Sequence, residues 1–161
     1  MLDERGDKNG GLSLNEKRGN KPYFPPLGWI GIGLKVIDKY DNGNNIWLGN
    51  SNSPGEWCVA YHGICSKKEV NENQNHSNCI DIYHPGNKVG NGVYCTPYIK
   101  YAENQAQILE ISGKKIKILL MVRVNPEAIR ACICYDTNEW VINGTVNEIR
   151  PYRILYKIID N

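Results

Sequence analysis

The chain of 161 residues has no long hydrophobic run, and no stretch approaches the roughly 20 apolar residues that a membrane-spanning helix needs. Its first residues also lack the apolar core of a secretory signal peptide. Charge of one sign is not concentrated anywhere, because 19 Lys and Arg and 17 Asp and Glu are spread along the chain, so no strong field for capturing nucleic acid is evident. We therefore expect an intracellular protein, in the cytoplasm or the nucleus, without a membrane partner.

The six cysteines form no regular framework of the kind found in small secreted domains, so we expect reduced thiols. Four potential zinc ligands lack the paired close spacings of a structural zinc site: Cys65, His76, Cys79 and His84. Cys132 and Cys134 would point the same way on a strand, which is typical of two small buried residues. The sequence therefore predicts no metal.

The length allows one well-buried domain and is too short for two of ordinary size. Hydrophobic residues make up 41% and charged residues 22%, close to globular averages. Residues 1–21 hold mostly glycines and charges with almost no apolar periodicity, which predicts a flexible tail or linker. We expect residues 22–161 to be a single catalytic-sized unit, and a monomeric domain of a larger protein.

Strand signals dominate the rest of the chain. Residues 56–63 are rich in β-formers and end in glycine, whereas residues 66–78 are polar and predict a loop. In the carboxyl half, strands are predicted at residues 117–124, 139–142 and 153–159, with Pro151 at the start of the last one. A helix is predicted after Pro97, with one face formed by Tyr98, Tyr101, Ala102, Gln105, Ala106 and Leu109. Many strands with one or two helices indicate an α+β domain built on antiparallel sheets.

Three segments, taken in order, resemble the catalytic core of ADP-ribosyltransferases of the poly(ADP-ribose) polymerase and diphtheria-toxin type. Tyr61-His62-Gly63 is similar to the family's His-Gly signature. Gly90-Asn91-Gly92-Val93-Tyr94 is similar to its Gly-Lys-Gly-Ile-Tyr segment. Asn138-Glu139-Trp140-Val141-Ile142 is similar to the Glu-Tyr-Val-Ile strand that carries the catalytic glutamate, and residues 150–155 resemble the strand that follows it.

The resemblance implies split, packed antiparallel sheets with few helices and a cleft for NAD⁺. It also implies transfer of ADP-ribose from NAD⁺ to a protein or nucleic-acid acceptor, with release of nicotinamide and without a metal. Glu139 would stabilise an oxocarbenium-like transition state and align the ribose 2′-hydroxyl. Tyr94 would stack on nicotinamide, His62 would fix the adenine-side ribose, and the backbone of Gly63 would bind the carboxamide.

The sequence departs from the family at two positions on the predicted helix. The family's second stacking tyrosine, eleven residues after the first, is replaced by Gln105, and a serine three residues earlier is replaced by Ala102. Losing the ring and the hydroxyl would weaken NAD⁺ binding by about 1–3 kcal/mol unless another group replaces them. Tyr101, one turn before Gln105 on the same face, is the candidate replacement. Two other functions therefore stay open: an NAD⁺ glycohydrolase, and a catalytically weak NAD⁺-binding or protein-interaction module on the same fold.

Each motif residue also has a structural interpretation when it is taken singly. His62 would serve as a hydrogen-bonded core histidine, Tyr94 as a packing residue of a sheet, and Glu139 as a solvated residue at the start of a strand. Glu148 also precedes a predicted strand and competes with Glu139 for the catalytic role. The similarity of residues 138–142 to the family's Glu-Tyr-Val-Ile strand favours Glu139.

Overall fold

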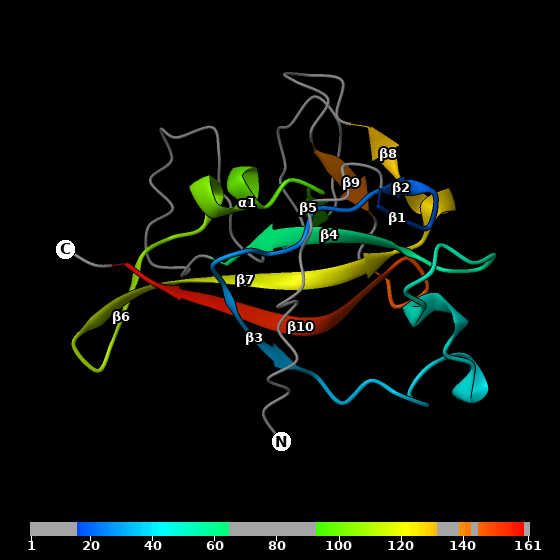
Figure 1. Cartoon of the computed structure of the whole chain (residues 1–161), viewed down its shortest axis with the longest axis horizontal. Helices are drawn as coiled ribbons and strands as arrows, with labels where there is room; N and C mark the ends of the chain where they lie inside the picture. Colours follow the sequence, from blue (N-terminus) through cyan, green and yellow to red (C-terminus); the bar gives the residue numbers. More distant parts are fainter. Residues whose placement is uncertain (1–15, 65–92, 132–138, 143–144, 160–161) are drawn as a thin grey trace.

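The computed structural model describes residues 16–64, 93–131, 139–142 and 145–159 (Figure 1). Its largest sheet has the order β3 (Ile30–Gly33), β10 (Ile149–Ile158), β7 (Lys114–Val124) and β4 (Cys58–Gly63), and β6 (Leu109–Ile111) also pairs with β7. A second sheet has the order β5 (Val93–Cys95), β9 (Trp140–Ile142) and β8 (Arg130–Ala131), and β1 (Lys17–Arg18) pairs with β2 (Lys21–Pro22). The helices are α1 (Ile99–Gln105) and the short 3₁₀ turns η1 (Asp41–Gly43), η2 (Ile46–Leu48) and η4 (Pro126–Ala128). All these strand pairs are antiparallel, so the predicted α+β class is confirmed.

Strand β7 is the centre of the large sheet, because it pairs with β10 on one side and with β4 on the other. Leu119 and Met121 are buried on one face of the strand, and Val122 and Val124 are buried on the other. A strand that is covered on both faces requires a nearly continuous apolar run, which is the pattern that predicted it.

Among the described residues, an isolated β-bridge joins the edges of the two larger sheets. Tyr61 of β4 and Thr96, just after β5, exchange two backbone hydrogen bonds of 2.8 and 3.0 Å. Figure 1 shows β5 and β9 on the side of β4 that faces away from β10. A cluster of buried apolar side chains from both sheets fills the space between them: Cys58, Ala60, Cys95, Val122, Val124, Trp140, Ile142 and Ile149.

Helix α1 packs on the other set of side chains of β4. The side chains of a strand alternate between its two faces, so Val59, Tyr61 and Gly63 share one face, opposite to that of Cys58 and Ala60. Val59 and Tyr61 form a second core with Ala102 and Ala106 of the helix region and with Leu119, Met121 and Leu155. The helix is therefore held by packing on β4.

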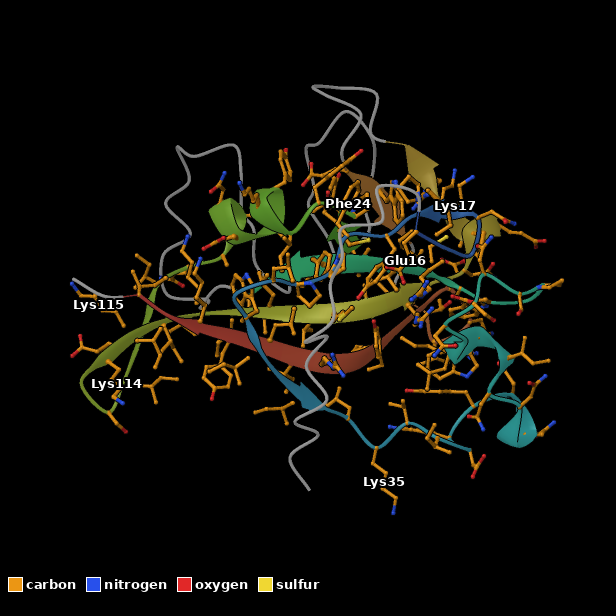
Figure 2. All side chains as sticks on the ribbon, viewed as in Figure 1. Glu16, Lys17, Phe24, Lys35, Lys114 and Lys115 are labelled. Atoms are coloured by element: carbon orange, nitrogen blue, oxygen red, sulfur yellow. The ribbon has the colours of Figure 1, made fainter. Side chains whose placement is uncertain are left out.

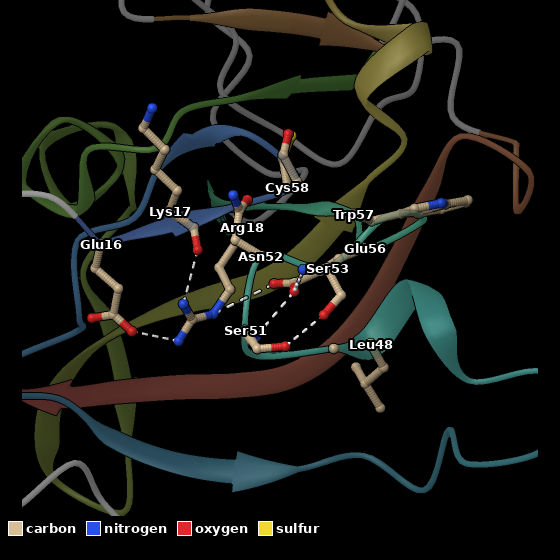
Figure 3. A network of polar contacts seen from close by, with 12 residues as sticks. Glu16, Lys17, Arg18, Leu48, Ser51, Asn52, Ser53, Glu56, Trp57 and Cys58 are labelled. Carbon is tan, nitrogen blue, oxygen red and sulfur yellow. Dashed lines mark hydrogen bonds and ion pairs between the residues drawn. The ribbon is translucent and has the colours of Figure 1, made fainter.

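The β1–β2 hairpin reaches from Pro22 back to Lys17, into the range predicted as a flexible tail. Buried Glu56 accepts hydrogen bonds from the backbone of Ser51 and Ser53, and its carboxylate lies 3.6 Å from Arg18 of the hairpin (Figure 3). The thiol of Cys58 donates to the carbonyl of Gly19. The contacts of Arg18 with Glu56 and of Cys58 with Gly19 are long-range and have no local sequence signal. Residues 1–15 of the predicted tail lie outside the described residues.

Two element boundaries also differ from prediction. The helix ends at Gln105, and Leu109 belongs to β6, because Ser112 and Gly113, both with positive φ, form a tight hairpin turn between β6 and β7. Figure 2 shows Lys114 and Lys115 at the end of the molecule where this hairpin lies. Pro151 is the third residue of β10, not its start. It is tolerated there because the ladder bulges next to it and β3 pairs with β10 only from Arg153 onward.

Several predictions lie outside the described residues. They are the loop at residues 66–78, the glycines of residues 90–92, the pair Cys132 and Cys134, and the alternative zinc ligands Cys65, His76, Cys79 and His84.

Candidate active site

His62 is buried near the end of β4 and is bonded to the second sheet. Its Nδ1 lies 2.7 Å from the carbonyl oxygen of Tyr94 in β5. Burial lowers the pKa of His62, because desolvation disfavours the imidazolium, and the bond to the Tyr94 carbonyl opposes this shift. A carbonyl oxygen only accepts, so the neutral ring carries its proton on Nδ1. Nε2 is then the atom with which His62 can accept a hydrogen bond from a ligand hydroxyl.

Tyr94 and Glu139 lie on one face of the three-stranded sheet. Tyr94 is paired with Val141 of β9, and Glu139 stands two residues before Val141, immediately before that strand. Residues two apart on a strand point to the same side, so Glu139 is the diagonal neighbour of Tyr94, about 7–8 Å away between backbone positions. Both side chains are half-buried. The aromatic ring and the carboxylate therefore share a surface that solvent reaches.

Glu139 is tied directly to helix α1. The amide Nε2 of Gln105 donates to Oε1 of Glu139 at 2.5 Å, across 34 residues of sequence. Burial raises the pKa of the Cys95 thiol on β5, and the negative charge of Glu139 raises it further. Glu139 thus lies where the end of α1 meets the three-stranded sheet.

Gly63 is the point at which α1 comes closest to β4. A Cβ atom on Gly63 would lie 2.9 Å from the carbonyl oxygen of Ala102 and 3.0 Å from the backbone nitrogen of Ala106. Ala102 itself is fully buried. The close approach of the helix therefore requires glycine at position 63, whether or not its backbone also binds a ligand. Ala102 fills a packing position between the helix and the sheet.

Sequence reasoning missed the residues that hold the helix in place. Lys117 donates to the carbonyl of Glu103 at 2.7 Å, and Lys157 lies 2.8 Å from the Glu103 carboxylate. At the other end of the helix, the Thr96 hydroxyl accepts from the backbone nitrogen of Tyr98. The Thr-Pro pair before the helical pattern is a signal that could have identified Thr96. The two lysines have no such signal, because they lie on β7 and β10.

Tyr101 and Glu148 complete the set of predicted residues. Tyr101 lies half-buried on α1, one turn before Gln105, as the helical spacing requires. Glu148 precedes β10 at the opposite end of β4 from the site. Ile149 is paired with Val124 and so with Cys58, four residues along the strand from His62, or about 13 Å. The structure therefore brings Glu139 toward β5 and α1, and places Glu148 elsewhere.

Among the residues that the structure describes, no three or more histidine, cysteine or acidic side chains gather into a group that could hold a metal ion. In the same part of the chain, no helix is long and apolar enough to cross a membrane. No protein-family model matches the sequence, and no curated protein matches it. What the geometry offers chemically is a neutral imidazole, a phenol ring and a carboxylate, placed on neighbouring strands where two antiparallel sheets join.

Proposed function

We propose that this chain is an NAD⁺-dependent ADP-ribosyltransferase that moves ADP-ribose to a macromolecular acceptor and releases nicotinamide. The observation that carries the proposal is the meeting of the three motif segments around β5. Tyr94 of that strand accepts the bond from His62 through its carbonyl and shares a sheet face with Glu139. Three segments that are far apart in the sequence meet around one strand, as the resemblance implies, and this supports the proposal.

The finer fold assignment belongs to the same proposal. We assign the sheet β3-β10-β7-β4 and the sheet β5-β9-β8 as the split pair of an ADP-ribosyltransferase core, joined at Tyr61 and Thr96. NAD⁺ would bind along β4 and β5, with its nicotinamide end toward Tyr94 and Glu139 and its adenine-side ribose toward His62.

Each residue has a defined task in the reaction. The bond between the nicotinamide nitrogen and the ribose breaks, its electron pair stays on the nitrogen, and nicotinamide leaves as a neutral molecule. Positive charge develops on the ribose, where the Glu139 carboxylate stabilises it and accepts a hydrogen bond from the 2′-hydroxyl. The Tyr94 ring fixes the plane of nicotinamide, and Nε2 of His62 accepts from a hydroxyl of the adenine-side ribose. A nucleophile on the acceptor then attacks the ribose and loses its proton.

Incubation of the chain with NAD⁺ labelled in its ADP-ribose part tests the proposal. Label on protein or nucleic acid identifies a transferase. Free labelled ADP-ribose with no labelled macromolecule identifies an NAD⁺ glycohydrolase. Intact NAD⁺ together with a raised melting temperature identifies a binding module, because a ligand that binds only the folded state stabilises it. Intact NAD⁺ and an unchanged melting temperature would refute NAD⁺ as the ligand.

The variant Glu139→Gln tests the assigned carboxylate. It keeps the shape of the side chain and an oxygen that Gln105 can still bond, but removes the negative charge. We expect the rate to fall by about 10²–10³, the usual cost of removing one preorganised electrostatic group. Glu148→Gln is the matched control, since Glu148 also precedes a strand but lies at the far end of β4. A loss of rate in the control with full activity in Glu139→Gln would move the role to Glu148.

A further inference from the structure

We propose that Gln105 is the positioning residue for Glu139, with its amide nitrogen holding Oε1 of the carboxylate at the site. The inference rests on the proposed function. It gives a task to the position where the resemblance leads one to expect a second stacking ring. At this position, the donor amide would orient the catalytic carboxylate.

The position of Gln105 is fixed by the packing of α1. Ala102 lies against Gly63, so the helix cannot move closer to β4. Lys117 and Lys157 hold Glu103, two residues before Gln105, through its carbonyl and its carboxylate. Contacts with β4, β7 and β10 therefore fix the backbone position from which the Gln105 side chain extends.

The chemistry of the pair sets the direction of the bond. A carboxylate only accepts, so the glutamine must present its nitrogen, which identifies Nε2 as the donor to Oε1. Hydrogen bonds to charged groups are stronger than those between neutral groups. Among the described residues, Oε2 of Glu139 has no such partner, and it is the oxygen left for a substrate hydroxyl. The bond thus selects which oxygen faces the ribose.

If Gln105 only orients Glu139, its removal should change the rate of turnover and not the binding of NAD⁺. A group that only orients Glu139 acts on the step in which charge develops on the ribose. A group that touches NAD⁺ would change binding of the ground state as well. Gln105→Met keeps the length and helix propensity of the side chain but removes the donor. We expect kcat to fall about tenfold to a hundredfold, with KM for NAD⁺ within about threefold of the wild-type value.

A double-mutant cycle with Glu139→Ala supplies the second measurement. If the two side chains act as a pair, removing Gln105 costs little once Glu139 is gone. In urea unfolding of the four proteins, we expect the single effects to be non-additive by about fivefold in the unfolding equilibrium constant. Asn104→Met is the matched control, because Asn104 is an exposed amide on the same helix. We expect Asn104→Met to leave kcat unchanged, and its effect on unfolding to be additive with that of Glu139→Ala.

The outcomes separate the two proposals. If kcat of Gln105→Met stays within twofold of wild type, or if the unfolding effects of the two single variants are additive, the positioning role is overturned. A raised KM at unchanged kcat would assign Gln105 to ligand binding instead, and it overturns the role equally. If the wild-type chain turns over no NAD⁺, the proposed function fails, and the unfolding cycle still decides whether Gln105 holds Glu139.

Discussion

Replacing Gly63 with alanine perturbs the contact that sets the distance between α1 and β4. The added Cβ would lie 2.9 Å from the carbonyl oxygen of Ala102 and within 3.2 Å of the backbone of Ala106. Ordinary contacts of this kind begin at roughly 3.4 Å, so the helix and the strand must separate by about 0.5 Å. Both opposing groups belong to the backbone. No change of side-chain rotamer relieves the clash, and trimming Ala102 to glycine would not relieve it either.

The cost follows from the size of that displacement. Inserting one methyl group into a well-packed interior destabilises a protein by about 1–3 kcal/mol. For a domain of this size, that loss lowers the melting temperature by about 3–9 °C. Gln105 moves with the helix, and a misplacement of about 1 Å at a reacting group can cost a hundredfold in rate. If the proposed function holds, about 0.5 Å should reduce turnover roughly tenfold.

Thermal unfolding of the wild type, Gly63→Ala and Gly33→Ala measures the effect. Gly33 is a matched control, because it also ends a strand of the large sheet but a Cβ atom there would have no neighbour within 4 Å. We expect Gly33→Ala to be neutral or to stabilise by up to about 1 kcal/mol, through the entropy of the unfolded chain. Equal stability of the two alanine variants would refute the close approach of α1 to Gly63.

Two further predictions concern the pH dependence and the stability of the fold. Because burial lowers the pKa of His62, the unfolded chain binds more protons below pH 6.5. Stability should therefore decrease as the pH falls, by up to about 1.4 kcal/mol per pH unit in that range, and urea unfolding between pH 5 and pH 7.5 should show a smaller decrease in His62→Asn. Arg150 is 2% exposed, lies 4.2 Å from the Trp57 ring, and bonds both Asp41 and the carbonyl of Val146. Arg150→Lys should lower the free energy of unfolding by about 2 kcal/mol, because lysine lacks the planar guanidinium group that stacks on the ring. Asp41→Asn should lower it by less than about 1 kcal/mol, because the side chain of Asp41 is 44% exposed. A similar loss in both variants would contradict a main role for stacking.

Strands whose signals are local could be predicted from the sequence. The apolar run of β7 and the β-formers of β4 identified both strands. A strand that is buried on both faces has an apolar composition that can be recognised in its own sequence, without knowledge of its neighbours in the sheet. The boundaries were less predictable. Whether β7 starts at Lys117 or at Lys114 depends on the hairpin with β6, and that hairpin depends on positive φ angles at Ser112 and Gly113.

For the candidate site, the sequence suggests residue types but does not indicate their contacts. His62, Tyr94 and Glu139 stand in short motifs, so their positions in the chain follow from the resemblance. The bond from Gln105 to Glu139 joins residues 34 apart and depends on how α1 sits on β4. The sequence shows only that Gln105 stands where the resemblance leads one to expect a tyrosine. Nothing in the neighbouring sequence indicates what its amide contacts. The Glu56 network that holds the β1–β2 hairpin was missed for the same reason.

The shortness of α1 explains why these contacts matter together. A helix of seven residues has little stability of its own, since nucleation is unfavourable and few hydrogen bonds follow it. Its conformation must come from the small residues that let it lie against β4 and from the two lysines that hold Glu103. Glu139 receives its hydrogen bond from the last residue of this helix. The orientation of the carboxylate therefore depends on the contacts that hold the helix at Gly63 and at Glu103. Loosening that packing should therefore reduce both the stability of the helix and the rate of the proposed reaction.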